Sequence, residues 1–269
     1  HQKLLEEAPS PFIGDDEEFR QKMGAVGVLA AQAVGYVNAG TVECLVDAEK
    51  NFYFLEMNTR LQVEHPVTEL VTGVDIVVQQ LRIAQGERLP FELQNLAMRG
   101  AAIECRINAE DAFNQFFPST GMVREHDVPT GPGVRVDTGV FGGSTITPHY
   151  DPMIAKLVCW GETRQQAIMR MRRALEEYRI LGVISNIPFH QNLLRDPRFL
   201  AGDFDTRFVE ERFSMAVAAE GNNRYPEIAA IVATLAAHEQ TERSARIDRD
   251  CQDGQSSWKR SGRWKEYGR

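Results

Sequence analysis

The sequence predicts an α+β protein, in which strands and helices occupy separate stretches of the chain. Three observations support this class. A run with helical spacing near the start is followed by a pair of β-rich runs, short strands punctuated by Gly and Pro lie between Gly121 and Trp160, and a long amphipathic helix follows them. With 269 residues, 43% of them apolar and 25% charged, the chain suits one large or two ordinary globular domains.

The first helix is predicted from Asp15 to about Val37. Acidic residues stand in its first turn, where the helix dipole favours them. Its apolar residues recur at spacings of three and four and should form a buried stripe: Phe19, Met23, Val26, Leu29, Ala30, Ala33 and Val34.

A β-hairpin is predicted next, from the β-rich runs 40–46 and 52–56 and the polar link 47–51 between them. This hairpin places Glu43 and Glu56 on strands that can lie side by side. Because two close carboxylates repel each other, a shared cation would relieve them. The hairpin therefore predicts a magnesium or manganese site.

The stretch from Glu56 to Glu64 alternates with a period of two. If it is extended, one face carries apolar and small side chains and the other carries ionic and amide groups: Glu56, Asn58, Arg60, Gln62 and Glu64. A solvated edge strand would alternate in the same way. Two carboxylates, two amides and a guanidinium within nine residues favour a chemical surface instead.

The next elements are two short helices at 68–72 and 74–84, the second of which ends at Gly86. A strand follows over 100–108, and Arg106 leaves it on the same face as its polar neighbours Glu104 and Asn108.

Beyond residue 120 the short β-like runs at 122–125, 133–138, 145–147 and 154–160 predict a small antiparallel sheet or barrel. The helix over 162–179 has Thr163 as a plausible cap, and its arginines are expected on a solvated face. A further helix over 186–194 and a turn at Asp196-Pro197 lead to an expected end of the fold near Phe213. Residues 228–237 suggest an apolar helix, and residues 239–269 are expected to be mobile.

Charge and cysteine content exclude several classes of protein. A formal charge of −8 argues against a nucleic-acid partner. Four scattered cysteines without a C-x-x-C pair indicate neither a zinc ribbon nor a disulfide framework, and we expect a cytoplasmic location. The sequence contains no apolar run of membrane-spanning length, and we expect no secretory leader. Because the chain opens on His1 in charged sequence, we expect a fragment or a processed product.

Several motifs resemble biotin carboxylase. The opening His-Gln-Lys and the run Gly40 to Glu43 match that family in the same order as the three longer motifs, which are EMNTR (56–60), QVEHPVTE (62–69) and ECRINAED (104–111). The E-x-N-x-R core alone would indicate only the ATP-grasp superfamily, and its continuation narrows the resemblance to biotin carboxylase.

The resemblance implies the C-terminal half of an ATP-grasp domain over residues 1–100, the biotin carboxylase C-terminal lobe over 101–213, and an extension over 214–269. It also implies ATP-dependent carboxylation of biotin with bicarbonate, as the first half-reaction of an acetyl-CoA, propionyl-CoA or pyruvate carboxylase. The cofactors would be ATP, Mg²⁺ or Mn²⁺, and biotin held on a separate carrier. The implied partners are a biotin carboxyl carrier protein, a second copy of the chain in a homodimer, and a carboxyltransferase subunit.

The same resemblance assigns roles to single residues. It implies that Glu64 is the base that deprotonates bicarbonate, and that Arg106 steadies the biotin enolate or the phosphate. The remaining implied groups are Lys3, Arg60, Gln62 and the Val63 backbone for bicarbonate, Glu43, Glu56 and Asn58 for the metal, and His1 and Leu45, with Glu43 and Glu56, for the nucleotide.

The sequence also departs from that family. It contains neither the glycine-rich lid that covers the ATP phosphates nor the lysines of the nucleotide half, and it has no biotinyl-lysine motif. We therefore expect the isolated chain to be inactive. Two alternatives stay open: another ATP-grasp ligase, and a catalytically silent dimerisation or scaffold module.

Overall fold

The computed structural model describes residues 3–14, 16–90, 96–215 and 230–238. Contacts divide the chain into one unit from His1 to Met215 and a second from Ala216 to Arg269. In the second unit, residues 230–238 are helical. The elements of the first unit are β1 (Leu5–Ala8), α1 (Glu17–Ala33), β2 (Thr41–Val46), β3 (Phe52–Asn58), α2 (His65–Thr72), α3 (Ile76–Ala84), β4 (Ala101–Asn108), β5 (Glu110–Asp111), β6 (Phe117–Pro118), β7 (Gly121–Met122), β8 (Glu125–Asp127), β9 (Val134–Thr138), β10 (Thr145–Ile146), β11 (Met153–Gly161), α4 (Arg164–Glu177), β12 (Arg179–Leu181), α5 (Ile187–Leu193), α6 (Pro197–Ala201) and the π-helical turn Phe208–Arg212.

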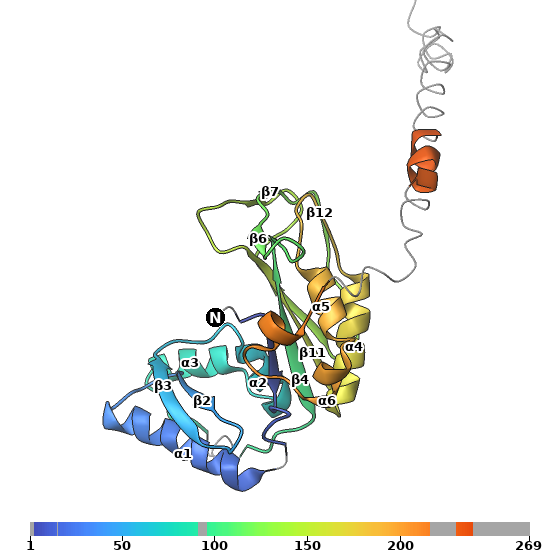
Figure 1. Cartoon of the computed structure of the whole chain (residues 1–269). Coiled ribbons are helices and arrows are strands. Elements are labelled where there is room, and N and C mark those ends of the chain that lie inside the picture. The colour runs from blue at the N-terminus through green and yellow to red at the C-terminus, as the bar shows by residue number, and fades with distance from the viewer. Residues whose placement is uncertain (1–2, 15, 91–95, 216–229, 239–269) are drawn as a thin grey trace, which may run out of the picture. The chain divides into compact units, whose positions relative to one another are not determined.

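A four-stranded antiparallel sheet in the order β1-β4-β11-β9 forms the centre of the first unit (Figure 1). Strand β4 is flanked on both sides, and all but one of its residues are buried. The register places Glu6 of β1 and Val158 of β11 opposite Glu104, and Lys156 of β11 opposite Arg106. Strand β4 therefore brings charged residues from distant parts of the chain close to one another.

The two faces of the sheet are covered by different helices. Helices α4 and α5 pack on one face, where Ile103, Cys105 and Ile107 of β4 join the main core. Helix α2 packs on the other face, where Val67 and Val71 meet a small apolar cluster from the sheet. Because side chains alternate along a strand, Glu104 and Arg106 lie on the α2 face.

Helix α1 confirms the predicted helix, and its ends follow local chemistry. The Asp16 side chain accepts a hydrogen bond from the Phe19 N–H at 3.0 Å and caps the first turn. The predicted buried stripe is wrong in its second half, since Phe19 is buried but Leu29 and Val34 are 63% and 70% exposed. In the described part of the chain, α1 packs mainly on β2, which leaves its other side uncovered.

The short strands after residue 120 do not close a barrel in the described residues. Strands β9 and β11 join the central sheet, while the others form two-stranded ladders, β10 with β7 and β12 with β8. A further two-stranded ladder, β5 with β6, lies just before them in the chain. The predicted sheet is thus confirmed and the barrel is not.

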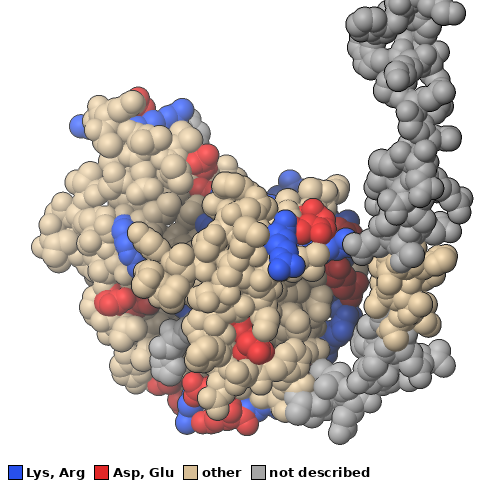
Figure 2. All heavy atoms as spheres, turned by 90° about the horizontal axis from the view of Figure 1, so that it is seen from above, with Lys and Arg blue, Asp and Glu red and all other residues tan. Residues whose placement is uncertain are grey.

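On the face shown in Figure 2, basic and acidic side chains are interspersed among uncharged surface.

Helix α4 begins as expected, with the Thr163 hydroxyl accepting from the Gln166 N–H at 3.2 Å. The prediction that its arginines form a solvated face is wrong for Arg164. Its guanidinium donates to both carboxylate oxygens of Glu7 at 2.6 and 3.0 Å, and also to the carbonyls of Phe199 and Leu200. This contact ties β1 to α4 and α6, and β1 leads directly from Lys3.

We expect Glu7→Ala to lower the free energy of unfolding by about 3–5 kcal/mol, because it leaves Arg164 partly buried without its carboxylate. The Glu7 side chain is only 5% exposed. Urea unfolding followed by circular dichroism measures the loss. The matched control is Glu162→Ala, which breaks the exposed Arg99 pair and should change the free energy of unfolding far less. Equal losses in the two variants would contradict the prediction.

Candidate active site

A cavity of about 500 Å³ opens where the β2–β3 hairpin, the loop before α2, and strand β4 meet. Its lining is mostly polar and comes from five segments: Lys3, Glu43, Glu56, Asn58, Arg60, Gln62, Val63, Arg106, Asn108, Glu110 and Asp151 to Met153. Most of the side chains singled out in the sequence therefore reach one place.

The predicted extended stretch from Glu56 to Glu64 is wrong beyond Asn58, where β3 ends. The chain then turns, and α2 begins at His65 with Pro66 in its first turn, a position that suits proline. The His65 ring nitrogen Nδ1 contacts the Gln62 carbonyl at 2.7 Å and holds this turn closed. The side chains still converge, but a strand end followed by a tight turn brings them together.

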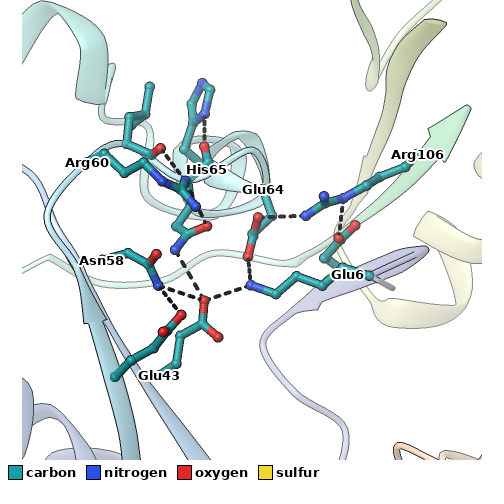
Figure 3. A network of polar contacts seen from close by, with 11 residues as sticks. Glu6, Glu43, Asn58, Arg60, Glu64, His65 and Arg106 are labelled. Carbon is teal, nitrogen blue, oxygen red and sulfur yellow. Dashed lines mark hydrogen bonds and ion pairs between the residues drawn. The ribbon is translucent and has the colours of Figure 1, made fainter. Parts of the chain in front are cut away.

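Glu43 and Glu56 face each other directly across the hairpin, which confirms the predicted pairing. Just beyond them the register shifts by one residue, so that Leu55 has no partner and forms a bulge. The Asn58 amide donates to one oxygen of each carboxylate, at 3.1 Å in both cases (Figure 3). The Gln62 amide donates to the same Glu43 oxygen at 3.2 Å.

These groups fit a magnesium ion. In the described residues, no group of three or more Asp, Glu, His or Cys side chains is arranged so that it could hold a metal ion. Mg²⁺ commonly binds through one or two carboxylates together with substrate phosphates and water, so Glu43 and Glu56 are a sufficient protein share. A half-turn of the Asn58 amide about its terminal bond would turn its oxygen toward such a cation.

Lys3 joins the two halves of the site. Its ammonium lies 2.8 Å from Glu43 Oε1 and 2.8 Å from Glu64 Oε1. Partial burial lowers the pKa of Lys3, but the hydrogen bonds to the two carboxylates outweigh it and raise that pKa above its ordinary value. Lys3 is therefore a fixed positive charge between the hairpin and the start of α2.

Glu64 is held by cations on both sides (Figure 3). One oxygen accepts from Lys3, and the other accepts from Arg106 Nη2 at 2.8 Å. Burial raises the pKa of Glu64, but Lys3, its own backbone N–H and Arg106 together lower it below the ordinary value. Glu64 is thus ionised at neutral pH beside two groups that also bind anions.

Arg106 is fixed at both its side chain and its backbone. Its Nε donates to Glu6 Oε1 at 2.8 Å, and its side chain is only 16% exposed. Behind the sheet, the Asn186 amide and the His190 Nε2–H each donate to the Arg106 carbonyl at 2.9 Å. Burial lowers the pKa of His190 to about 4, so this ring is neutral at neutral pH and serves as a donor.

Comparisons with known proteins identify the family of the chain. Residues 104–211 match the family described as biotin carboxylase C-terminal domain, and residues 1–92 match the carbamoyl-phosphate synthase L chain ATP-binding domain. The chain belongs to the biotin carboxylase family. It is 53% identical to a biotin carboxylase from Nostoc sp. over 78% of this chain and 47% of that protein, and 53% identical to a biotin carboxylase from Halalkalibacterium halodurans over 78% and 46%.

A solved biotin carboxylase domain gives the same result for the fold. The 2-oxoglutarate carboxylase domain from Hydrogenobacter thermophilus, a dimer in complex with MgADP, ADP and bicarbonate, superimposes with a TM-score of 0.75 at 48% identity, over 78% of this chain and 46% of that chain. The chain spans about half the length of the biotin carboxylase relatives it matches. None of the helices described in the structure has the length and apolar character needed to cross a membrane.

The biotin carboxylase resemblance also implies His1 and Leu45 at the nucleotide, and the structure describes only the second of them. Leu45 of β2 pairs with Tyr53, is 53% exposed and does not line the cavity. His1 lies outside the described residues. Arg60 and Val63 do line the cavity. The Arg60 guanidinium donates to the Gln62 side chain at 3.4 Å, and the Val63 carbonyl accepts from Lys156 at 2.9 Å.

Residues that the sequence did not assign to this biotin carboxylase site support the assigned ones from the central sheet. Glu6 holds Arg106, and Lys156 holds the Val63 carbonyl and Asp137 at 3.3 Å. Glu104, opposite Glu6, is completely buried. No local signal in the sequence indicates Glu104, because its burial depends on β1 and β11, which flank β4 on either side.

Proposed function

We propose that this chain supplies the bicarbonate and metal part of a biotin carboxylase, and that the complete enzyme carboxylates biotin at the expense of ATP. One observation carries the proposal: Glu64 is ionised and is held by two cations, Lys3 and Arg106, which line the polar cavity and are themselves anion-binding groups. The Hydrogenobacter relative is named as a complex with MgADP and bicarbonate, which supports these two classes of ligand.

Glu64 serves as the general base in this proposal. Lys3 and Arg106 both bind the Glu64 carboxylate. When bicarbonate enters, its negative charge competes for the same two cations, and Glu64 becomes a stronger base as their contacts are shared. Glu64 then takes the hydroxyl proton of bicarbonate.

The resulting carbonate attacks the γ-phosphorus of ATP, and the bond from that phosphorus to the bridging oxygen of ADP breaks. The product, carboxyphosphate, decomposes to CO₂ and phosphate. Glu43 and Glu56, with Asn58, would hold the metal that offsets the phosphate charge when it is bound. Arg60, Gln62 and the Val63 N–H complete the bicarbonate site, and Arg106 also steadies the biotin enolate or the phosphate.

The remaining assignments follow from the family and stay predictions. Biotin would arrive on a separate carrier protein, its carboxyl group would pass to a carboxyltransferase subunit, and the enzyme would be a cytoplasmic homodimer. The dimer is supported by the Hydrogenobacter structure, which is described as one. The division into residues 1–100, 101–213 and 214–269 is likewise a prediction.

The test is bicarbonate-dependent phosphate release from ATP by the complete enzyme, with saturating biotin. Glu43→Gln keeps the size of the side chain and removes one metal-binding charge, so we expect the Mg²⁺ concentration for half-maximal rate to rise about 10-fold or more. The matched control, Glu162→Gln, alters an exposed carboxylate outside the cavity and should leave that concentration unchanged. Absence of any bicarbonate-dependent turnover in the complete enzyme would contradict the proposed function and favour a silent scaffold module.

A further inference from the structure

Two buried carboxyl groups lie next to the proposed base without a full set of partners. Glu104 is 0% exposed, and neither of its carboxyl oxygens has a hydrogen-bond partner within the described residues. Glu6 lies directly opposite Glu104 on β1, and its Oε2 is also buried without a partner. Directly opposed residues of an antiparallel pair have Cβ atoms about 4.5–5.5 Å apart, so the two carboxyl groups are neighbours.

Two negative charges cannot both be favourable here. An ionised carboxylate that is buried without hydrogen bonds pays a large desolvation cost, and a second carboxylate beside it adds repulsion. Glu6 has a reason to be ionised, since it accepts from Arg106 Nε at 2.8 Å. Glu104 has none, because no group donates a hydrogen bond to it in the described part of the chain.

The surroundings of Glu104 reinforce this difference. The charged groups that face it are Glu6 from β1, Arg106 from its own strand, Lys156 from β11 and Glu64 at the start of α2. Lys156 is engaged with the Val63 carbonyl and Asp137, and the residues of α2 that pack on this part of the sheet, Val67 and Val71, are apolar. Burial, followed by the charge of Glu6, raises the pKa of Glu104 to about 8, and burial raises the pKa of Glu6 to about 7.

We propose that Glu6 and Glu104 form a carboxyl pair that holds one proton at neutral pH, and that the single remaining charge positions Arg106 for Glu64. In this arrangement Glu104 is the neutral partner, and Glu6 Oε2, buried without a partner among the described residues, would accept its proton. Glu6 anchors Arg106 by Nε, which leaves Nη2 directed at Glu64 (Figure 3). Both are positioning residues, and their effect on the reaction rests on the proposed function.

The pair has a consequence for pH dependence. Loss of the proton at alkaline pH places a second negative charge beside Arg106, and this charge competes with Glu64 for the guanidinium. The rate should then fall as the pH rises through the titration of the pair. Glu104→Gln keeps the size, has no proton to lose and leaves one charge on Glu6, so this alkaline decline should disappear or move to higher pH.

Two measurements on the complete protein test the proposal. Infrared spectroscopy detects protonated carboxyl groups. At pH 7 we expect the wild-type protein to show the band of such a group, and we expect this band to be lost in Glu104→Gln. The pH profile of kcat for bicarbonate-dependent ATP cleavage is then compared among wild type, Glu104→Gln and Glu6→Gln. Near pH 7 the Glu104 variant should keep a kcat close to wild type, whereas the Glu6 variant should lose about 10- to 100-fold in kcat, with the KM for ATP little changed, because Arg106 loses its anchor.

Three outcomes would overturn the proposal. A wild-type protein without a protonated-carboxyl band at pH 7 has no proton on the pair, and a band unchanged in Glu104→Gln places the proton elsewhere. If kcat falls at alkaline pH in the same way in wild type and in Glu104→Gln, the proton on the pair does not control the position of Arg106. Failure of the proposed function is recognised separately, as a wild-type enzyme without bicarbonate-dependent turnover whose infrared band is nevertheless present.

Discussion

Glu64→Gln in the complete enzyme is expected to lower kcat for bicarbonate-dependent ATP cleavage by about 10²–10⁴-fold, the usual contribution of a positioned general base. The amide keeps the size of the side chain but cannot take a proton from bicarbonate. Affinity for ATP should change little, because Glu64 is not one of the carboxylates that face each other across the hairpin. Steady-state kinetics with varied ATP and varied bicarbonate separate the two effects.

The pH dependence of the wild-type enzyme gives a second test of Glu64. Since the pKa of Glu64 is lowered in the folded protein, its ionised form should persist below the range where an ordinary glutamate takes up a proton. Any acid limb due to Glu64 in the pH profile of kcat/KM, which reports the free enzyme, should therefore lie below the ordinary pKa of 4.5. A Glu64→Gln enzyme with wild-type kcat at neutral pH would reduce Glu64 to a structural role, and Glu162→Gln is again the control.

Local patterns predicted those parts of the site that lie close together in the sequence. The hairpin, with Glu43 opposite Glu56, follows from two β-rich runs joined by a short polar link, and a register shifted by one residue would put the two carboxylates on opposite faces. The alternation from Glu56 to Glu64 correctly predicted that these side chains converge, but it wrongly predicted an extended backbone over the whole stretch. Pro66 favours a helix start, and that signal outweighs the alternation.

The long-range pairings could not be predicted from the sequence, and the reason is physical. The contacts of Glu6 with Arg106 and of Glu7 with Arg164 depend on strand order and register in the central sheet. Nothing local to Glu6 or Glu7 distinguishes them from two solvated glutamates, because their burial exists only once β1 pairs with β4. The same holds for Glu104, whose unusual position is visible only when both neighbouring strands are known.

The 269-residue chain, expressed alone, is expected to bind Mg-ATP weakly or not at all and to leave free biotin uncarboxylated. Phosphoryl transfer depends on holding the triphosphate in line with its attacker and shielding it from water. The sequence supplies Glu43, Glu56 and Asn58 for a hydrated metal ion, but it contains no glycine-rich lid and none of the lysines that accompany it in the family. Contacts from the hairpin alone would be heavily screened by solvent.

The hairpin is also weakly supported in the isolated chain. Strands β2 and β3 form a two-stranded sheet, and such a sheet is marginally stable unless other elements cover it. Apolar side chains along it are more than half exposed: Leu45, Tyr53, Phe54 and Leu55. This surface should promote association or aggregation of the isolated chain.

Isothermal titration with Mg-ATP, together with phosphate release in saturating biotin and bicarbonate, tests the expected inactivity of the isolated chain. Adding the N-terminal half of a homologous biotin carboxylase as a separate polypeptide is the matched complement, and recovery of turnover should require both pieces. Recovery should fail with Glu64→Gln in this chain, which shows that the restored site uses the same base. Robust turnover by the 269 residues alone would contradict the prediction, because the hairpin, Lys3 and Arg106 would then position the triphosphate without a lid.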